Sequence, residues 1–190
     1  MILEIKRAQK DKDTLGGIFE VIARGVVPGL GSYTQWDRRL DADLAKAVMS
    51  IPGVKGVEIG NGFRVAGERG SCVHDEISFD KKQKRFTRKT NRAGGIEGGI
   101  SNGEDIIIGA VMKPIATLLD PLESVNIRTK KKAKAQVERA DVCVVPAAGV
   151  IAESAVALEI ARSLTQKFGG DTIAEMKRNY EGYLSALKKL

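Results

Sequence analysis

The stretch NRAGGIEGGISNGEDIIIGAVMKP, residues 91–114, joins a glycine-rich segment to a short apolar run. The apolar run predicts a buried strand that ends at Pro114, because proline cannot donate a backbone hydrogen bond to a neighbouring strand. The glycines at 94–103 predict a main chain that takes positive φ angles or approaches a ligand closely. Their spacing matches neither G-x-G-x-x-G nor G-x-x-x-x-G-K-[ST], which excludes the two common phosphate-binding loops. A flexible turn remains the alternative.

The segments on either side of this stretch alternate between strand and helix patterns. Period-two alternation or short apolar runs bounded by turn residues predict strands. The strands are expected at residues 16–25, 54–63, 105–114 and 141–149. Apolar residues on one face, with glycine or proline stop signals, predict helices. The helices are expected at residues 38–51, at 150–170 and from 171 onward, the last beginning with a capping box of Thr172 and Glu175.

Strands and long helices in this order predict an α+β fold rather than a strict β-α-β repeat. The 190 residues suffice for one domain with a real core, so a single domain over residues 1–190 is expected. The chain has no apolar run long enough to span a membrane. Its charged N-terminus does not resemble a secretory signal. Cys72 and Cys143 show neither metal-site spacing nor a disulfide framework, which fits a reducing cytoplasm.

The formal net charge of +7 favours anionic partners such as phosphorylated small molecules, nucleic acid or an acidic protein. Two basic clusters, at residues 81–89 and 128–136, contribute most visibly, and each could also be a solvated loop. Aromatic residues make up 5% of the chain and are not interleaved with the basic runs. A stacking platform for single-stranded nucleic acid is therefore poorly supported, and no nucleic-acid partner is expected.

The residues suited to chemistry lie at the ends of two of the expected strands. Lys113 closes one strand, and Arg139 and Asp141 open another. Arginine binds phosphate or carboxylate through a planar fork, lysine through a point charge, and an ionised aspartate can act as a base. A surface ion pair beside a solvated lysine is the simpler alternative. His74 is the single histidine, so neither a catalytic triad nor a metal site is expected.

Three long motifs in order resemble the chorismate synthase family. They are residues 23–63, residues 88–106 followed by MKPIATL at 112–118, and residues 128–161 with the sequence RAD before VPAAG. The resemblance implies a β-α-β sandwich core and a homotetramer. It also implies conversion of 5-enolpyruvylshikimate 3-phosphate to chorismate and phosphate, an anti-1,4-elimination without net redox change. The family reaction requires reduced FMN, with NADPH as a candidate reductant.

The resemblance also implies roles for individual residues. Asp141 would assist loss of the ring proton, and Arg139 would contact flavin or substrate. The implied FMN contacts are Gly53, Val54, Gly98, Lys113, Pro114, Ile115, Ala116, Thr117 and Arg139. In this interpretation the glycines at 94–103 make room for the planar ring of the flavin.

The motifs correspond to the C-terminal half of the family pattern, from about Asp13 to about Tyr183. A separate N-terminal half or partner chain is therefore expected to complete the enzyme, and the 190-residue chain alone is expected to be inactive. Gly109 stands where the family usually carries an arginine, which removes a cation near the expected substrate site. The alternatives are a non-catalytic module that binds flavin or a partner and, more weakly supported, a basic nucleic-acid-binding domain.

Overall fold

The structure is a computed structural model that describes residues 1–189. Its centre is a three-stranded antiparallel sheet in the order β1-β7-β2. The α-helices are α1 (Ile2–Lys10), α2 (Leu40–Met49), α3 (Gly70–Val73), α4 (Val145–Phe168) and α5 (Ile173–Leu187), with 3₁₀ turns η1 (Trp36–Arg38) and η2 (Gly62–Gly67). The strands are β1 (Gly17–Ala23), β2 (Val54–Ile59), β3 (Ile77–Asp80), β4 (Arg85–Arg88), β5 (Ile96–Glu97), β6 (Ile100–Ser101), β7 (Ile106–Met112), β8 (Glu123–Val125) and β9 (Lys132–Lys134).

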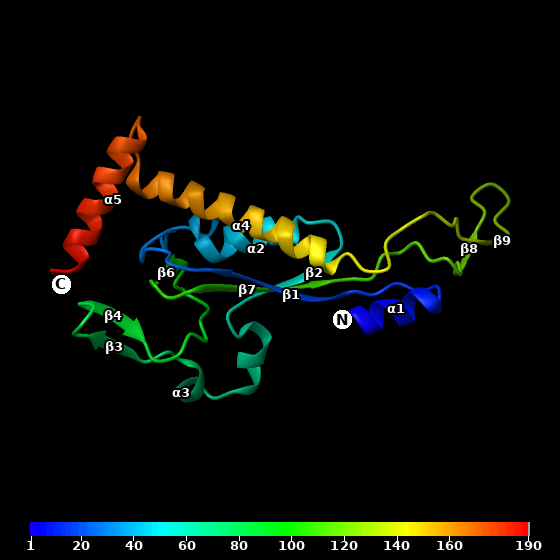
Figure 1. Ribbon diagram of the computed structural model, residues 1–190, viewed down its shortest axis with the longest axis horizontal. Coiled ribbons are helices and arrows are strands. Elements are labelled where there is room, and N and C mark those ends of the chain that lie inside the picture. Colours follow the sequence, from blue (N-terminus) through cyan, green and yellow to red (C-terminus); the bar gives the residue numbers. More distant parts are fainter. Residues whose placement is uncertain (190) are drawn as a thin grey trace.

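The apolar run of the opening stretch forms β7, the middle strand, which pairs with β1 on one side and β2 on the other. Alternate β7 residues, including Ile106 and Ile108, point into the core. Helices α2 and α4 cover this face of the sheet, as Figure 1 shows. Leu44 of α2 and Val156 of α4 are fully buried there, so helix and sheet share one apolar core.

Within residues 1–189, the opposite face of the sheet carries no helical layer. Its side chains include Ile18, which is 76% exposed, and Val111, which is 41% exposed. The fold is therefore α+β as expected, with one layer of sheet and one layer of helices.

Three hairpins and the helices α1, α3 and α5 extend from this centre. In Figure 1 the β8–β9 arm and α1 lie at one end of the long axis, and α5 and the β3–β4 hairpin lie at the other. Helix α5 begins with the expected capping box, because Thr172 accepts a hydrogen bond from the Glu175 backbone while the Glu175 carboxylate accepts one from the Thr172 backbone.

The strand expected at residues 141–149 is wrong. Only Cys143 makes an isolated bridge, to Leu15, and helix α4 begins at Val145. Pro146 lies in the first turn of this helix, where its fixed φ is favourable and its missing N–H costs nothing. The β-branched residues before Pro146 favour a strand locally, but this segment forms no ladder of strand hydrogen bonds beyond the single bridge at Cys143.

Candidate functional site

The end of β7 is fixed to the turn that precedes β2. The Lys113 backbone N–H donates to the Gly53 carbonyl over 2.9 Å, and Val54 pairs with Met112. Gly53 has φ +90°, and a Cβ there would lie 3.0 Å from the Met112 side chain. This turn therefore holds the main chain of Lys113 in place while its side chain stays exposed.

Residues 14–16 connect this strand end to the segment before α4. The Thr14 hydroxyl donates to the Ile115 carbonyl over 2.7 Å, and the Leu15 N–H donates to the Val142 carbonyl over 2.7 Å. A Cβ on Gly16 would lie 2.3 Å from the Met112 carbonyl oxygen, so the chain passes tightly against the strand. Two segments therefore lie at the same end of the sheet, Lys113–Thr117 and Arg139–Asp141. In the sequence they are separated by the β8–β9 arm.

Three charged side chains at this end of the sheet are exposed, those of Lys113, Arg139 and Asp141. Within residues 1–189, none of them takes part in a salt bridge or a side-chain hydrogen bond. Arg139 and Asp141 lie in irregular chain rather than at a strand end, which corrects their expected setting. Two cations free of partners within these residues can bind an anionic group such as a phosphate, and an exposed carboxylate beside them can accept a proton.

Gly98 lies elsewhere. It occupies the turn between β5 and β6, which precedes the first residue of β7. Lys113, in contrast, directly follows the last residue of β7. A strand with the length of β7 spans roughly 20 Å at about 3.3 Å per residue. The structure thus groups Gly53, Val54 and Lys113–Thr117 with the Arg139–Asp141 segment, but it does not bring Gly98 to them.

The glycine-rich stretch mostly serves the fold itself. A Cβ on Gly94 would lie 2.3 Å from the Gly60 nitrogen, and one on Gly95 would lie 2.5 Å from the Asp105 carbonyl oxygen. A Cβ on Gly99 would lie 2.7 Å from the Arg39 side chain. Gly98 differs, because its φ is +61° and no atom lies within 4 Å of an added Cβ. Among the residues that the structure describes, Gly98 is thus the one glycine of 94–103 with open space around an added Cβ.

Gly98 lines a cavity of about 370 Å³ together with His74, Asp75 and Arg92. Asp75 accepts hydrogen bonds from the Thr90 hydroxyl and from the backbone N–H groups of Arg92 and Ala93, both over 2.9 Å. Partial burial acts to raise the pKa of Asp75, but these hydrogen bonds outweigh it and hold the pKa below its usual value. Sequence reasoning missed Asp75, because its partners lie fifteen or more residues away along the chain.

Gly109 lies between two glutamates. The strand register places it opposite Glu20 on β1 and opposite Glu58 on β2. The Glu58 side chain folds over the glycine, since a Cβ there would lie 3.0 Å from Glu58 Cγ. This position is therefore surrounded by negative charge, a property that spacing along the sequence does not reveal.

None of the helices in residues 1–189 has the length and apolar composition needed to cross a membrane. Within the same residues, no group of three or more His, Cys, Asp or Glu side chains is placed to hold a metal ion.

Comparison with known proteins gives one consistent family. Residues 1–165 match the family model described as chorismate synthase. A chorismate synthase from Geobacter sulfurreducens is 57% identical over 190 residues, covering 97% of this chain and 48% of the relative. One from Acidobacterium capsulatum is 53% identical over 194 residues, covering 100% and 49%. A crystal structure of chorismate synthase is 40% identical with a TM-score of 0.83, covering 100% of this chain and 48% of that chain. The chain thus spans about half the length of these relatives.

Proposed function

The chain belongs to the chorismate synthase family, and we propose that it supplies the C-terminal half of an active site that converts 5-enolpyruvylshikimate 3-phosphate to chorismate and phosphate. The observation that carries this proposal is that Lys113–Thr117 and Arg139–Asp141 lie at the same end of the sheet. Residues 14 and 15 join the two segments by hydrogen bonds to Ile115 and Val142. The reaction removes a ring proton and expels phosphate, so it requires a base and cations close together.

In this proposal Lys113 and Arg139 bind the anionic groups of substrate and cofactor. Their exposed, unpaired side chains support this role, because no internal carboxylate competes for them within residues 1–189. Asp141 accepts the ring proton, for which an accessible carboxylate is suited. The family reaction requires bound reduced FMN, although the reaction itself involves no net redox change.

The remaining proposed flavin contacts divide into two places. Gly53, Val54, Pro114, Ile115, Ala116 and Thr117 surround Lys113. The open backbone of Gly98 supports a separate contact at the other end of β7. NADPH is the proposed reductant of the flavin.

The proposed partners follow from the half-length match. An N-terminal half, on the same polypeptide or on a separate chain, would provide the rest of the active site, and the assembly would be a homotetramer. We place the protein in the cytoplasm, where the free thiols of Cys72 and Cys143 would stay reduced. The half-length match also favours a second candidate, a non-catalytic module that retains flavin or partner binding.

The variant Asp141→Asn tests the catalytic proposal. The chain is mixed with an N-terminal family half, reduced FMN and substrate without oxygen, and chorismate absorbance is followed. Turnover should fall by about 10²–10⁴-fold, the usual contribution of a general base, while flavin affinity changes little. Asp120→Asn, another exposed aspartate of the same region, is the matched control and should keep full turnover. Equal turnover for Asp141→Asn and the parent would remove the base from the proposal.

A further inference from the structure

A second and larger cavity lies at the other end of the molecule from Lys113. Its volume is about 710 Å³, within the range of small-molecule sites. The loop at residues 25–29, the β3–β4 hairpin, the turn after β6 and the C-terminal half of α5 form its walls. Figure 1 shows the end of α5 and the β3–β4 hairpin on the same side of the molecule.

The walls are tied together by hydrogen bonds. The Tyr183 hydroxyl of α5 donates to the Pro28 carbonyl over 2.9 Å. The buried Ser101 hydroxyl donates to the Val27 carbonyl over 2.7 Å and accepts from the Leu30 N–H over 2.8 Å. These bonds join α5, the loop at residues 25–29 and the turn after β6. The β3–β4 hairpin is held to the same region by Arg88, whose backbone N–H donates to Glu104 and whose guanidinium donates to Glu97.

The lining combines an apolar floor with a cationic rim. Val26, Val27, Ile100, Leu184 and Leu187 contribute apolar side chains. The rim carries Lys84, Arg85, Arg88 and Lys188, with Glu97 as its one acidic residue.

Glu97 does not neutralise the whole rim. It accepts two hydrogen bonds from the Arg88 guanidinium, over 3.0 and 2.7 Å, and so compensates Arg88 alone. Within residues 1–189, Lys84, Arg85 and Lys188 have no carboxylate partner. Three positive charges therefore remain around an apolar cavity.

We propose that this groove is a binding site for a small amphipathic anion with a ring or branched apolar body and a phosphate, sulfonate or carboxylate head. The apolar floor would bury the body, and Lys84, Arg85 and Lys188 would hold the head. The site is separate from the Lys113–Arg139–Asp141 cluster, which lies beyond the far end of β7. Its occupancy does not depend on the chain being catalytic.

The probe is 1-naphthyl phosphate, titrated by calorimetry into the 190-residue chain, with 1-naphthol as the neutral comparison. We expect one molecule of the phosphate per chain and at least tenfold weaker binding of the naphthol. The double variant Lys84→Gln/Arg85→Gln should weaken phosphate binding at least tenfold. Leu187→Glu, which brings a carboxylate into the groove, should abolish it, and circular dichroism checks that both variants stay folded.

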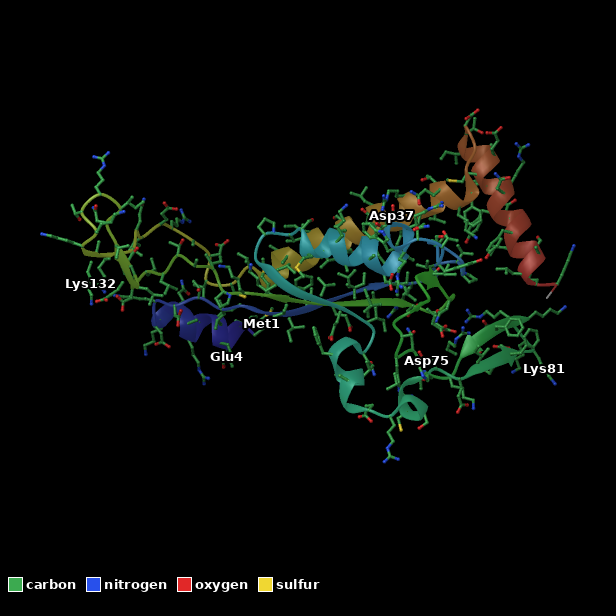
Figure 2. All side chains as sticks on the ribbon, turned by 180° about the vertical axis from the view of Figure 1, so that it is seen from behind. Met1, Glu4, Asp37, Asp75, Lys81 and Lys132 are labelled. Carbon is green, nitrogen blue, oxygen red and sulfur yellow. The ribbon has the colours of Figure 1, made fainter. Side chains whose placement is uncertain are left out.

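The matched control is Lys131→Gln/Lys132→Gln on the β8–β9 arm, which removes the same charge at the opposite end of the molecule. Figure 2 shows Lys132 at one end and Lys81 of the β3–β4 turn at the other. This control should bind like the parent. Equal losses in both double variants, equal binding of naphthol, or no saturable binding would each overturn the proposal.

Discussion

Lys113 combines a fixed main chain with a free side chain. Its N–H bonds to Gly53, and no carboxylate within residues 1–189 pairs with its ammonium. Replacement by alanine should therefore remove a ligand contact without disturbing the strand end. We expect Lys113→Ala to weaken FMN binding by about 10–100-fold, the effect of one hydrogen bond to a charged group. Flavin fluorescence titration of the mixture with an N-terminal half measures this.

The control for this prediction is Lys177→Ala, an exposed lysine on α5. It changes the net charge equally and should leave flavin affinity unchanged. An unchanged dissociation constant for Lys113→Ala would remove this lysine from the flavin site.

Gly109 offers a second test at the scale of one residue. An arginine here would lie between Glu20 and Glu58 on the neighbouring strands. Glu58 would have to shift slightly, because an added Cβ lies 3.0 Å from its Cγ. Cross-strand ion pairs contribute about 0.2–1 kcal/mol. We therefore expect the free energy of unfolding of Gly109→Arg to be higher than that of Gly109→Gln by about this amount.

Urea unfolding in low and high salt measures this difference, and the advantage of arginine should shrink in high salt. The glutamine variant supplies a side chain without charge, which isolates the electrostatic part. If the two variants unfold at the same urea concentration in low salt, the glutamates do not act on this position.

At the scale of the elements, regular patterns were predictable and tertiary pairings were not. The apolar run gave β7, the apolar repeat every four residues gave α4, and Thr172 with Glu175 gave the start of α5. The strand expected at 141–149 was wrong, because the β-branched run before Pro146 has only Leu15 as a bridging neighbour. Local propensity does not say whether a neighbouring strand exists.

The candidate site shows the same limit. Sequence reasoning named Lys113, Arg139 and Asp141, because their charges and motif positions are visible in the chain. The bonds that bring them together involve Thr14 and Leu15, which carry no distinctive signal. The close neighbours of the glycines, such as Gly60 for Gly94, are likewise distant in sequence, so their packing could not be predicted from spacing. Their part in flavin binding stays a prediction.

Gly60 and Gly98 form a matched pair for testing close approach of the main chain. Their φ angles are +59° and +61°, so alanine meets similar backbone strain at both. A Cβ on Gly60 would lie 2.2 Å from the Arg92 carbonyl oxygen, whereas Gly98 has open space. We expect Gly98→Ala to cost about 1–2 kcal/mol, the left-handed penalty alone, and Gly60→Ala to cost clearly more.

Urea midpoints of the two variants decide this prediction. Equal losses would mean that the φ angle alone explains both glycines. The Gly98 variant then serves the flavin proposal as well, because it stays folded and narrows the space in which a ligand could approach the backbone.

Asp75 predicts a pH dependence for the segment it holds. The Asp75 carboxylate accepts hydrogen bonds from Thr90, Arg92 and Ala93. The pKa of Asp75 in the folded state is lowered. As the pH falls, the unfolded chain takes up the proton first, so the stabilisation is full above about pH 4 and is lost below it. Between pH 7 and pH 3 the parent should lose more stability than Asp75→Asn, which cannot titrate.

Urea unfolding at several pH values gives the slope of the unfolding free energy against pH for the parent and for Asp75→Asn. Asp120→Asn, which replaces an exposed carboxylate, should keep the slope of the parent. Parallel slopes for the parent and Asp75→Asn would show that the Asp75 contacts do not depend on its charge.

At the scale of the whole molecule, large apolar side chains remain exposed on both sides of the core. Ile18 and Val111 lie on the open face of the sheet, and Val150 and Leu158 lie on the outer side of α4. Leu158 is 71% exposed, although it lies in the middle of a 24-residue helix. Exposed patches of this kind mark surfaces that bind other protein. The single-domain boundary over residues 1–190 stays a prediction.

The last prediction concerns the chain on its own. We expect the 190-residue chain to self-associate through these surfaces and to make no detectable chorismate. Its proposed cluster contributes two cations and one carboxylate. A leaving phosphate needs several donors, and loss of one such donor typically costs about 10²–10³ in rate. An equal amount of an N-terminal family half should reduce self-association and restore turnover. Light scattering and anaerobic chorismate absorbance measure the two effects. A lone chain as active as the mixture would contradict the division of the active site into two halves.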